Sequence, residues 1–159
     1  MAFNIIKARE CAKLWLGTPH HDRMAKVGAG IDCIHFVREI LIAGGMTDPF
    51  KCPYYLPRWG IGRGNNVLER LLLKCYDAAV VPFGKPLKNG DIFIFAVGKQ
   101  SNHCGIVLDG ECWHSQARHV VHPMKITPDI LERLQSVVRI KKPGLRFRPE
   151  LLTSEDFKQ

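Results

Sequence analysis

Apolar residues recur at helical spacing near the beginning of the chain and again after a glycine-containing loop. Residues 4–16 place apolar side chains among charged ones until Gly17-Thr18-Pro19 interrupts them, which predicts a first helix. Residues 32–43 form a strongly apolar run that stops at Gly44-Gly45, which is typical of a buried helix that ends at glycine. Residues 67–76 are amphipathic and predict another helix.

The pattern changes to that of strands further along the chain. Residues 92–97 are apolar on both faces, which predicts a central strand. Residues 103–108 and 111–116 flank Asp109-Gly110, a sequence that favours a two-residue hairpin turn. The other expected elements are short strands at 120–121 and 136–140 and a helix at 127–134.

The order of these elements predicts an α+β domain in which N-terminal helices pack on a central antiparallel β-sheet. We place this single domain at residues 1–142 and a C-terminal tail at residues 143–159. Residues 46–66 predict a long loop, and such loops in compact domains are usually functional or disordered. Gly60–Gly64 within it resembles a phosphate loop only superficially, because Gly-Lys-Ser/Thr and a preceding strand are missing, so it predicts a flexible turn.

The two-residue turn determines which residues of the hairpin lie opposite each other. Gly105 pairs with His114 and His103 with Gln116, and because side chains alternate between the faces of a strand, these residues share one face with Cys112. His103 and His114 are then diagonal neighbours, roughly 7–8 Å apart, which long side chains can bridge. Gly105 between them is expected to leave room for a substrate or a second backbone.

Cys33 lies where the glycine-containing loop meets the second predicted helix, directly after Asp32. The helix dipole and the unpaired N–H groups at a helix N-terminus favour a thiolate. A thiol, an imidazole and an orienting polar group form an arrangement used in nucleophilic catalysis, and Cys33, His103 and His114 supply it. The competing interpretation is that Cys33 only packs in the core and that both histidines are surface residues of a hairpin.

A zinc site would use residues from the same part of the sequence. His114, His119 and His122, with Cys112 nearby, are candidate ligands, but their short spacings lack a matching pair of cysteines. The six cysteines are irregularly spaced and contain no Cys-x-x-Cys pair, so we expect most of them to be reduced and buried. The sequence therefore predicts no metal and no cofactor.

Composition adds a strong positive charge to this picture. The chain has 159 residues, with 23 Lys and Arg against 15 Asp and Glu, which gives a net charge of +8 and suits anionic surroundings. The basic residues near the C-terminus are expected to form a solvated face, so nucleic acid is not the predicted partner. No apolar run approaches the ~20 residues of a membrane span, and the start does not read as a secretory signal. We expect synthesis in the cytoplasm and delivery by a separate route, such as association with a virion.

Five segments, spread over most of the chain, follow one another in the order of the motifs of a known family. They are residues 15–19 (WLGTP), 30–37 (GIDCIHFV), 89–95 (NGDIFIF), 103–108 (HCGIVL) and 113–115 (WHS). Together they resemble the first helix and turn, the nucleophile motif, the Gly-Asp strand, the histidine strand and the third-residue strand of the NlpC-type cell-wall cysteine peptidases. The resemblance runs from about residue 8 to residue 140 and looks closest to the small phage and gene-transfer-agent members.

The resemblance implies a papain-like fold in which Cys33 is the nucleophile, His103 the general base and His114 the residue that orients the imidazole. It implies hydrolysis of amide bonds in peptidoglycan stem peptides, of the D-γ-glutamyl-diaminopimelate type. The implied partners are peptidoglycan and phage tail proteins. The expected oxyanion and pocket residues are His20, Asp32 and Gln116.

Two positions depart from the family pattern. The family usually has Tyr after the Gly-x-Pro turn, where this chain has His20, and a small pair after the nucleophile, where this chain has Ile34-His35. Both changes bear on the substrate more than on the triad. Two alternatives stay open: a thiol amidase or acyltransferase of the same fold that acts on a different substrate, and a non-catalytic phage tail module. The intact set of Cys33, His103 and His114 argues against the second alternative.

Overall fold

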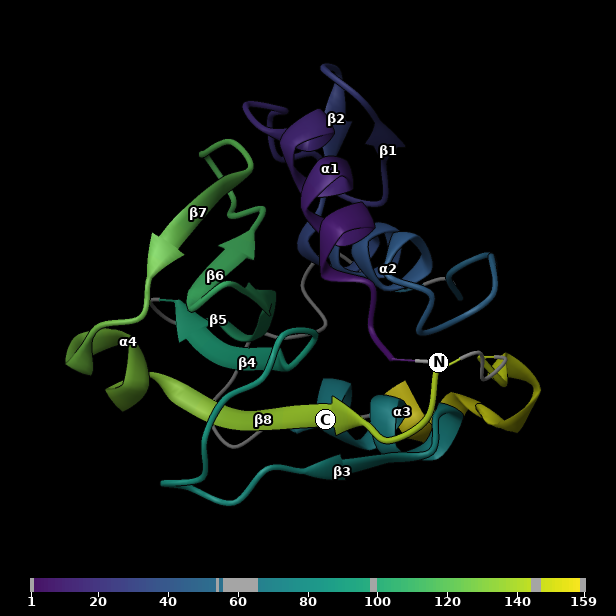
Figure 1. The fold of residues 1–159 in the computed structure, drawn as a ribbon. Helices are drawn as coiled ribbons and strands as arrows, with labels where there is room; N and C mark the ends of the chain where they lie inside the picture. Colours follow the sequence, from purple (N-terminus) through teal and green to yellow (C-terminus); the bar gives the residue numbers. More distant parts are fainter. Residues whose placement is uncertain (1, 54, 56–65, 98–99, 144–146, 158–159) are drawn as a thin grey trace.

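The computed structural model describes residues 2–53, 55, 66–97, 100–143 and 147–157, and Figure 1 shows their arrangement. The helices are α1 (Ile5–Trp15), α2 (Cys33–Ala43), α3 (Val67–Cys75) and α4 (Pro128–Glu132), with two short 3-10 helices at Pro149–Leu151 and Ser154–Phe157. The strands are β1 (Ala25–Lys26), β2 (Gly30–Ile31), β3 (Ala78–Val80), β4 (Ile92–Val97), β5 (Gln100–Leu108), β6 (Glu111–His114), β7 (His122–Lys125) and β8 (Leu134–Ile140).

Six of these strands form one antiparallel sheet in the order β3-β8-β4-β5-β6-β7. Strands β1 and β2 form a separate two-stranded ribbon in the loop before α2. The predicted α+β fold, with N-terminal helices on a central antiparallel sheet, is therefore confirmed. In the part of the chain that the structure describes, no helix is both long enough and apolar enough to cross a membrane.

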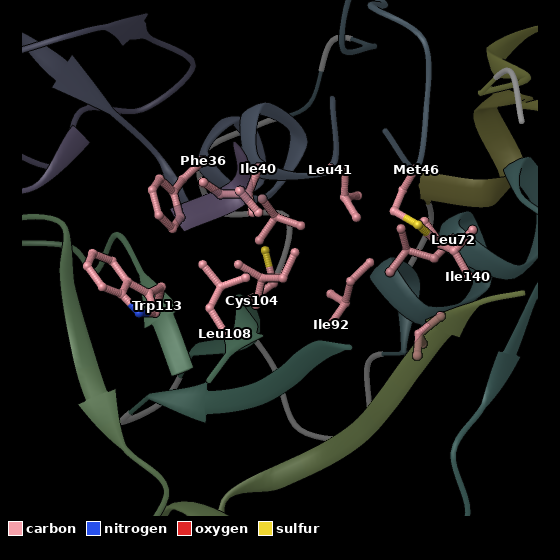
Figure 2. Close-up of a cluster of buried hydrophobic side chains, with 14 of the residues drawn as sticks. Phe36, Ile40, Leu41, Met46, Leu72, Ile92, Cys104, Leu108, Trp113 and Ile140 are labelled. Atoms are coloured by element: carbon pink, nitrogen blue, oxygen red, sulfur yellow. The ribbon is translucent and has the colours of Figure 1, made fainter. Parts of the chain in front are cut away.

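The sheet separates two apolar clusters because side chains alternate along its strands. Helices α1 and α2 cover one face, and the larger cluster between helices and sheet includes Phe36 and Ile40 of α2 with Cys104 of β5 (Figure 2). The smaller cluster, on the other face, includes Phe95 and Cys112. Burying each large apolar side chain contributes about 1.5–3 kcal/mol, so docking onto the larger cluster holds α2 over the sheet.

The predicted hairpin register is confirmed for the pairs Gly105–His114, Ile106–Trp113, Val107–Cys112 and Leu108–Glu111. The predicted pair of His103 with Gln116 does not form, because β6 ends at His114. Asp109 and Gly110 both have positive φ, at 50° and 80°, as a two-residue hairpin turn requires. The helices predicted at residues 4–16, 32–43 and 67–76 are also confirmed, with ends that differ by one residue or less.

The strand predicted at residues 120–121 is only a single antiparallel bridge between Val120 and Pro19. The Val121 N–H donates to the Thr18 carbonyl oxygen at 2.8 Å and its carbonyl oxygen accepts from the Gly17 N–H at 3.0 Å, so this segment ties down the loop after α1. The neighbouring edge strand is β7, in which Pro123 lies opposite Trp113. Proline has no N–H to donate and is tolerated at a sheet edge.

The segment after residue 142 packs on the domain. Phe147 is part of the larger apolar cluster and stacks on Phe50, with ring centroids 4.2 Å apart. Asp156 accepts a hydrogen bond from Nζ of Lys74 in α3 at 2.8 Å. The predicted turn at Gly60–Gly64 lies outside the described residues.

Candidate active site

Cys33 is the first residue of α2, and Asp32 caps this helix. Oδ1 of Asp32 accepts a hydrogen bond from the His35 N–H at 2.8 Å, which satisfies one of the N–H groups that the helix itself leaves unpaired. The first intrahelical bond runs from the Phe36 N–H to the Asp32 carbonyl oxygen. The N–H groups of Cys33 and Ile34 therefore have no acceptor within the helix, and they can face a developing negative charge next to the thiol.

The two predicted histidines meet on one face of the hairpin. Nε2 of His103 lies 2.8 Å from Nδ1 of His114, and the two side chains are buried, with 5% and 0% of each residue exposed. The ring of Phe95 packs edge-on against both imidazoles. The diagonal placement expected from the hairpin register thus results in a direct hydrogen bond between the rings.

The Cys33 thiol lies against two consecutive residues of β5. The hydrogen bond from the Cys104 thiol is the largest influence on its pKa, and together with the hydrogen bond and charge of His103 it outweighs the effect of burial. The pKa of Cys33 is consequently lowered well below its usual value. The pKa of Cys104 is raised, first by the same hydrogen bond and then by burial, so the charge of the pair resides on Cys33.

His114 remains neutral. Burial, reinforced by the positive charge of His103 and of the neighbouring histidines, lowers the pKa of His114 to about 3. A neutral His114 that accepts the His103 Nε2–H at its Nδ1 carries its own proton on Nε2. Nε2 of His114 is buried and has no hydrogen-bond partner among the described residues. With Nε2 of His103 directed at His114, Nδ1 of His103 is the nitrogen left for the thiol.

A second polar cluster lies on the helix side of Cys33. Nδ1 of His35 is 2.9 Å from Oδ1 of Asp32, and the hydroxyl of Tyr55 donates to Oδ2 of the same carboxylate. Burial opposes the charge of His35, but the hydrogen bond with Asp32 and a further one with Cys52 raise its pKa to about 10. Burial likewise opposes the charge of Asp32, and the hydrogen bonds from His35 and Tyr55 still lower its pKa. Asp32 therefore caps the helix and anchors Tyr55, and as a carboxylate it has no proton to donate to an oxyanion.

A cavity of about 60 Å³ opens beside the thiol and is lined by Cys33, His103, His20, Gln116 and Tyr55 among others. Nδ1 of His20 is 3.1 Å from Oγ of Ser115, and its Nε2 is 3.2 Å from Oδ1 of Asp22. Both ring nitrogens of His20 are thus engaged, and contact with a substrate oxyanion would require one of these bonds to break. Gln116 reaches the same cavity from the segment after β6.

Gly105 was expected to leave room for a substrate or a second backbone, and the structure shows the second of these, the backbone of β6. A Cβ atom at residue 105 would lie 2.5 Å from Sγ of Cys112 and 2.9 Å from the carbonyl oxygen of Trp113. These atoms of the neighbouring strand already occupy the space. Gly105 is needed there for the close approach of β6.

The sequence alone did not place Cys104 or Tyr55 at this site, and it indicated His35 only as a departure from the family pattern. Cys104 directly follows His103, so strand alternation placed it on the other face, and its contact with Cys33 depends on how α2 docks. Tyr55 comes from the long loop, whose path through space cannot be predicted from a repeating sequence pattern.

The candidate zinc ligands His114, His119 and His122 do not form a metal-binding group. Within the described ranges, no group of three His, Cys, Asp or Glu side chains is arranged to hold a metal ion.

Solved structures share this fold. No protein-family model and no curated protein match the sequence. The chain has the fold of the NlpC/P60 proteins. It is similar to an NlpC/P60 family protein from Bacillus cereus, with a TM-score of 0.57 and 20% identity over 89% of this chain and 42% of that chain. It is also similar to the NlpC/p60 domain of the peptidoglycan hydrolase SagA, with a TM-score of 0.51 and 18% identity over 86% of this chain and 99% of that domain. The chain thus spans less than half the length of the Bacillus protein and almost all of the SagA domain. At these identities the likeness establishes the fold.

Proposed function

We propose that this protein is a cysteine peptidase that hydrolyses amide bonds in peptidoglycan stem peptides, of the D-γ-glutamyl-diaminopimelate type. The observation that carries the proposal is a continuous chain of contacts from the Cys33 thiol through His103 to His114. Cys33 lies at the N-terminus of α2. The fold, shared with a domain from a peptidoglycan hydrolase, supports the same reading.

In this mechanism the Cys33 thiolate attacks the carbonyl carbon of the scissile amide. The oxyanion that forms is stabilised by the Cys33 N–H at the start of α2, because a helix N-terminus favours negative charge. His103, as an imidazolium, gives its proton to the leaving amine, and a thioester to Cys33 remains. His103 then takes a proton from water, which hydrolyses the thioester and restores the thiolate.

His114 positions His103 without competing for its proton. Its pKa of about 3 keeps it neutral at the pH of the reaction, so it accepts the Nε2–H of His103 and does not take the proton. The proton of His103 that takes part in the reaction is then the one on Nδ1, which faces the thiol and the leaving group.

Purified peptidoglycan provides the test. The wild-type protein is expected to release stem-peptide fragments with a new diaminopimelate amino group, identified by mass spectrometry, and Cys33→Ala is expected to release none. Cys11→Ala is the matched control, because Cys11 is also half-buried but donates to the carbonyl oxygen of Glu39 and does not line the site cavity. Identical inert profiles for wild type and Cys33→Ala would contradict the proposed substrate.

Alkylation of Cys33 separates a wrong substrate from a wrong mechanism. A lowered pKa predicts that Cys33 reacts with iodoacetamide at neutral pH faster than Cys11, whose pKa is raised mainly by burial. Fast alkylation without hydrolysis would point to a thiol enzyme with another substrate. Alkylation no faster than that of Cys11 would contradict any thiol chemistry at this site.

The second candidate function is that of a thiol amidase or acyltransferase that acts on an apolar acyl group. It is favoured by an apolar cavity of about 80 Å³ that shares Ile34 and Tyr55 with the site cavity and has Cys104 in its wall. Incubation with thioesters of short fatty acids tests it, and a covalent acyl group on Cys33 is the expected product.

We also propose that the peptidase acts as part of a phage-type particle. The sequence resemblance to small phage members supports this location, and the net charge of +8 suits a substrate that lies among anionic wall polymers. Co-purification of the chain with tail proteins would support the placement, and its recovery only as free protein would contradict it.

A further inference from the structure

Cys104 is a buried thiol next to the candidate nucleophile, and the peptidase mechanism does not use it. It is 2% exposed and belongs to the apolar cluster between α2 and the sheet (Figure 2). In Figure 2 its sulfur atom points from β5 towards α2. The half-buried Cys33 packs against the same cluster, and the two thiols share a hydrogen bond.

The backbone around Cys104 is held on both sides. Asn102 has a positive φ of 59°, its Oδ1 accepts from the Leu68 N–H at 3.1 Å, and its own N–H donates to Oε1 of Gln135 at 2.9 Å. On the other side, Gly105 packs closely against Cys112 of the neighbouring strand β6. With β5 fixed in this way and α2 fixed by its apolar face, Cys104 is held facing α2, the helix that begins at Cys33.

We propose that Cys33 and Cys104 are a redox modification site, at which a peroxide converts the two thiols into a reversible intramolecular disulfide. In the first step the Cys33 thiolate attacks one oxygen of hydrogen peroxide; the O–O bond breaks, Cys33 becomes a sulfenic acid, and the released hydroxide takes up a proton to form water. In the second step the Cys104 sulfur attacks the Cys33 sulfur, the S–OH bond breaks, and the hydroxide leaves as water with the Cys104 proton. In total, two thiols and one peroxide give one disulfide and two waters.

The order of the two steps follows from the electrostatics of the pair. Cys33 holds the negative charge and lines the open cavity, so a small peroxide reaches it first. The hydrogen bond with charged Cys33 is the main reason that the pKa of Cys104 is raised. Sulfenic acid formation neutralises Cys33, so Cys104 loses that influence and gives up its proton more easily in the second step.

The disulfide would have two consequences. It would occupy the sulfur that attacks the substrate, and it would protect that sulfur from irreversible oxidation to the sulfinic acid. The first consequence, reversible loss of hydrolysis, rests on the proposed peptidase function. Formation of the disulfide does not, because it requires only the two thiols and a peroxide.

Mass spectrometry of the peroxide-treated full chain tests the proposal. The expected result is a loss of two hydrogen atoms per chain, a cross-linked peptide that contains Cys33 and Cys104, and recovery of both thiols with a dithiol reductant. In Cys104→Val the same treatment is expected to give sulfinic acid on Cys33 that the reductant does not reverse. Cys52→Ser is the matched control, because Cys52 is the other half-buried thiol near the site, and it should behave as the wild type does.

Three results would overturn the proposal: sulfinic acid on Cys33 in the wild type at the rate seen in Cys104→Val, a cross-link from Cys33 to Cys52, or no oxidation of Cys33 at all. Circular dichroism shows whether Cys104→Val is folded, and if it is not, the cross-link map of the wild type decides alone. Failure of the peptidase proposal would appear separately, as absence of hydrolysis by the fully reduced chain.

Discussion

His35 lies on the helix side of Cys33 and His114 on the sheet side, and the two imidazoles differ in protonation state. On the helix side, the Asp32 carboxylate and its surroundings raise the pKa of His35 to about 10, so His35 is protonated. On the sheet side, burial and neighbouring positive charge lower the pKa of His114 to about 3, so His114 is neutral. Both side chains are mostly buried, with 16% of His35 exposed. The difference teaches that the partner of a buried imidazole decides its charge.

The two sides accordingly do different work. On the helix side, one carboxylate makes several contacts that stabilise the fold: Asp32 caps α2 and binds the side chains of His35 and Tyr55. On the sheet side, His103 lies between the Cys33 thiol and the neutral His114, so its proton can leave and return while the contacts of Asp32 stay in place. We therefore expect changes on the sheet side to reduce activity more than stability, and changes on the helix side to do the reverse.

The largest effect is expected for His103→Ala. Loss of the acid–base group should lower kcat/KM for stem-peptide hydrolysis by about 10³–10⁴-fold, and loss of the hydrogen bond to His114 should lower the free energy of unfolding by about 1–3 kcal/mol. His21→Ala is the control, because His21 is exposed on the loop before α2. Retention of more than about a tenth of the activity in His103→Ala would contradict the assigned role of His103.

His114 should have a smaller effect that depends on what replaces it. His114→Leu removes the acceptor for the His103 Nε2–H and should lower kcat/KM by about 10²-fold, whereas His114→Asn keeps an acceptor oxygen and should lose less than about tenfold. The comparison of the two variants in the same hydrolysis assay is the measurement. Equal losses would show that the acceptor at this position does not matter.

On the helix side, Asp32→Ala should reduce stability. It removes the cap of α2 and leaves His35 and Tyr55 without their acceptor, so the free energy of unfolding should fall by about 2–4 kcal/mol in urea titrations. The matched control is Asn4→Ala at the cap of α1, where Oδ1 accepts from the Lys7 N–H, and a loss of about 1 kcal/mol is expected. If both variants lose the same amount, Asp32 acts as a cap and nothing more.

The two histidines should also give pH dependences on opposite sides of their usual pKa of 6.5. The pKa of His35 is raised to about 10, so its contribution to stability is complete below pH 6.5 and is lost as the pH rises towards 10. The pKa of His114 is lowered to about 3, so its contribution is complete above pH 6.5 and is lost as the pH falls towards 3. The slope from either residue is at most about 1.4 kcal/mol per pH unit.

Unfolding by urea across the pH range measures both slopes. His35→Gln should flatten the alkaline side of the stability profile and His114→Asn the acidic side, each relative to the wild type. A flattening of the same side by both variants would contradict the charge states on which the comparison rests.

Local sequence signals predicted much of the site. The Asp109-Gly110 turn determined the hairpin register and so placed His103 and His114 on one face, and the position of Cys33 after Asp32 indicated a capped helix start. These predictions succeeded because each depends on residues close together in the chain.

What could not be predicted depends on how distant segments dock. Cys104 meets Cys33 because α2 packs on β5, and Tyr55 reaches Asp32 from a long loop. Likewise, the close approach of Cys112 and of the Trp113 carbonyl oxygen decides that Gly105 leaves room for a second backbone and not for a substrate. Strand and helix periodicity carries no information on such contacts.

The edge strand β7 has a consequence for the behaviour of the protein at high concentration. An exposed edge offers unpaired N–H and C=O groups to the edge of a second molecule and is a common start of aggregation. Pro123 lies within β7 and has no N–H to offer, and Lys125 adds a charge at the end of the strand. At high concentration, the β7 edge of one molecule is therefore not expected to pair with the sheet edge of another.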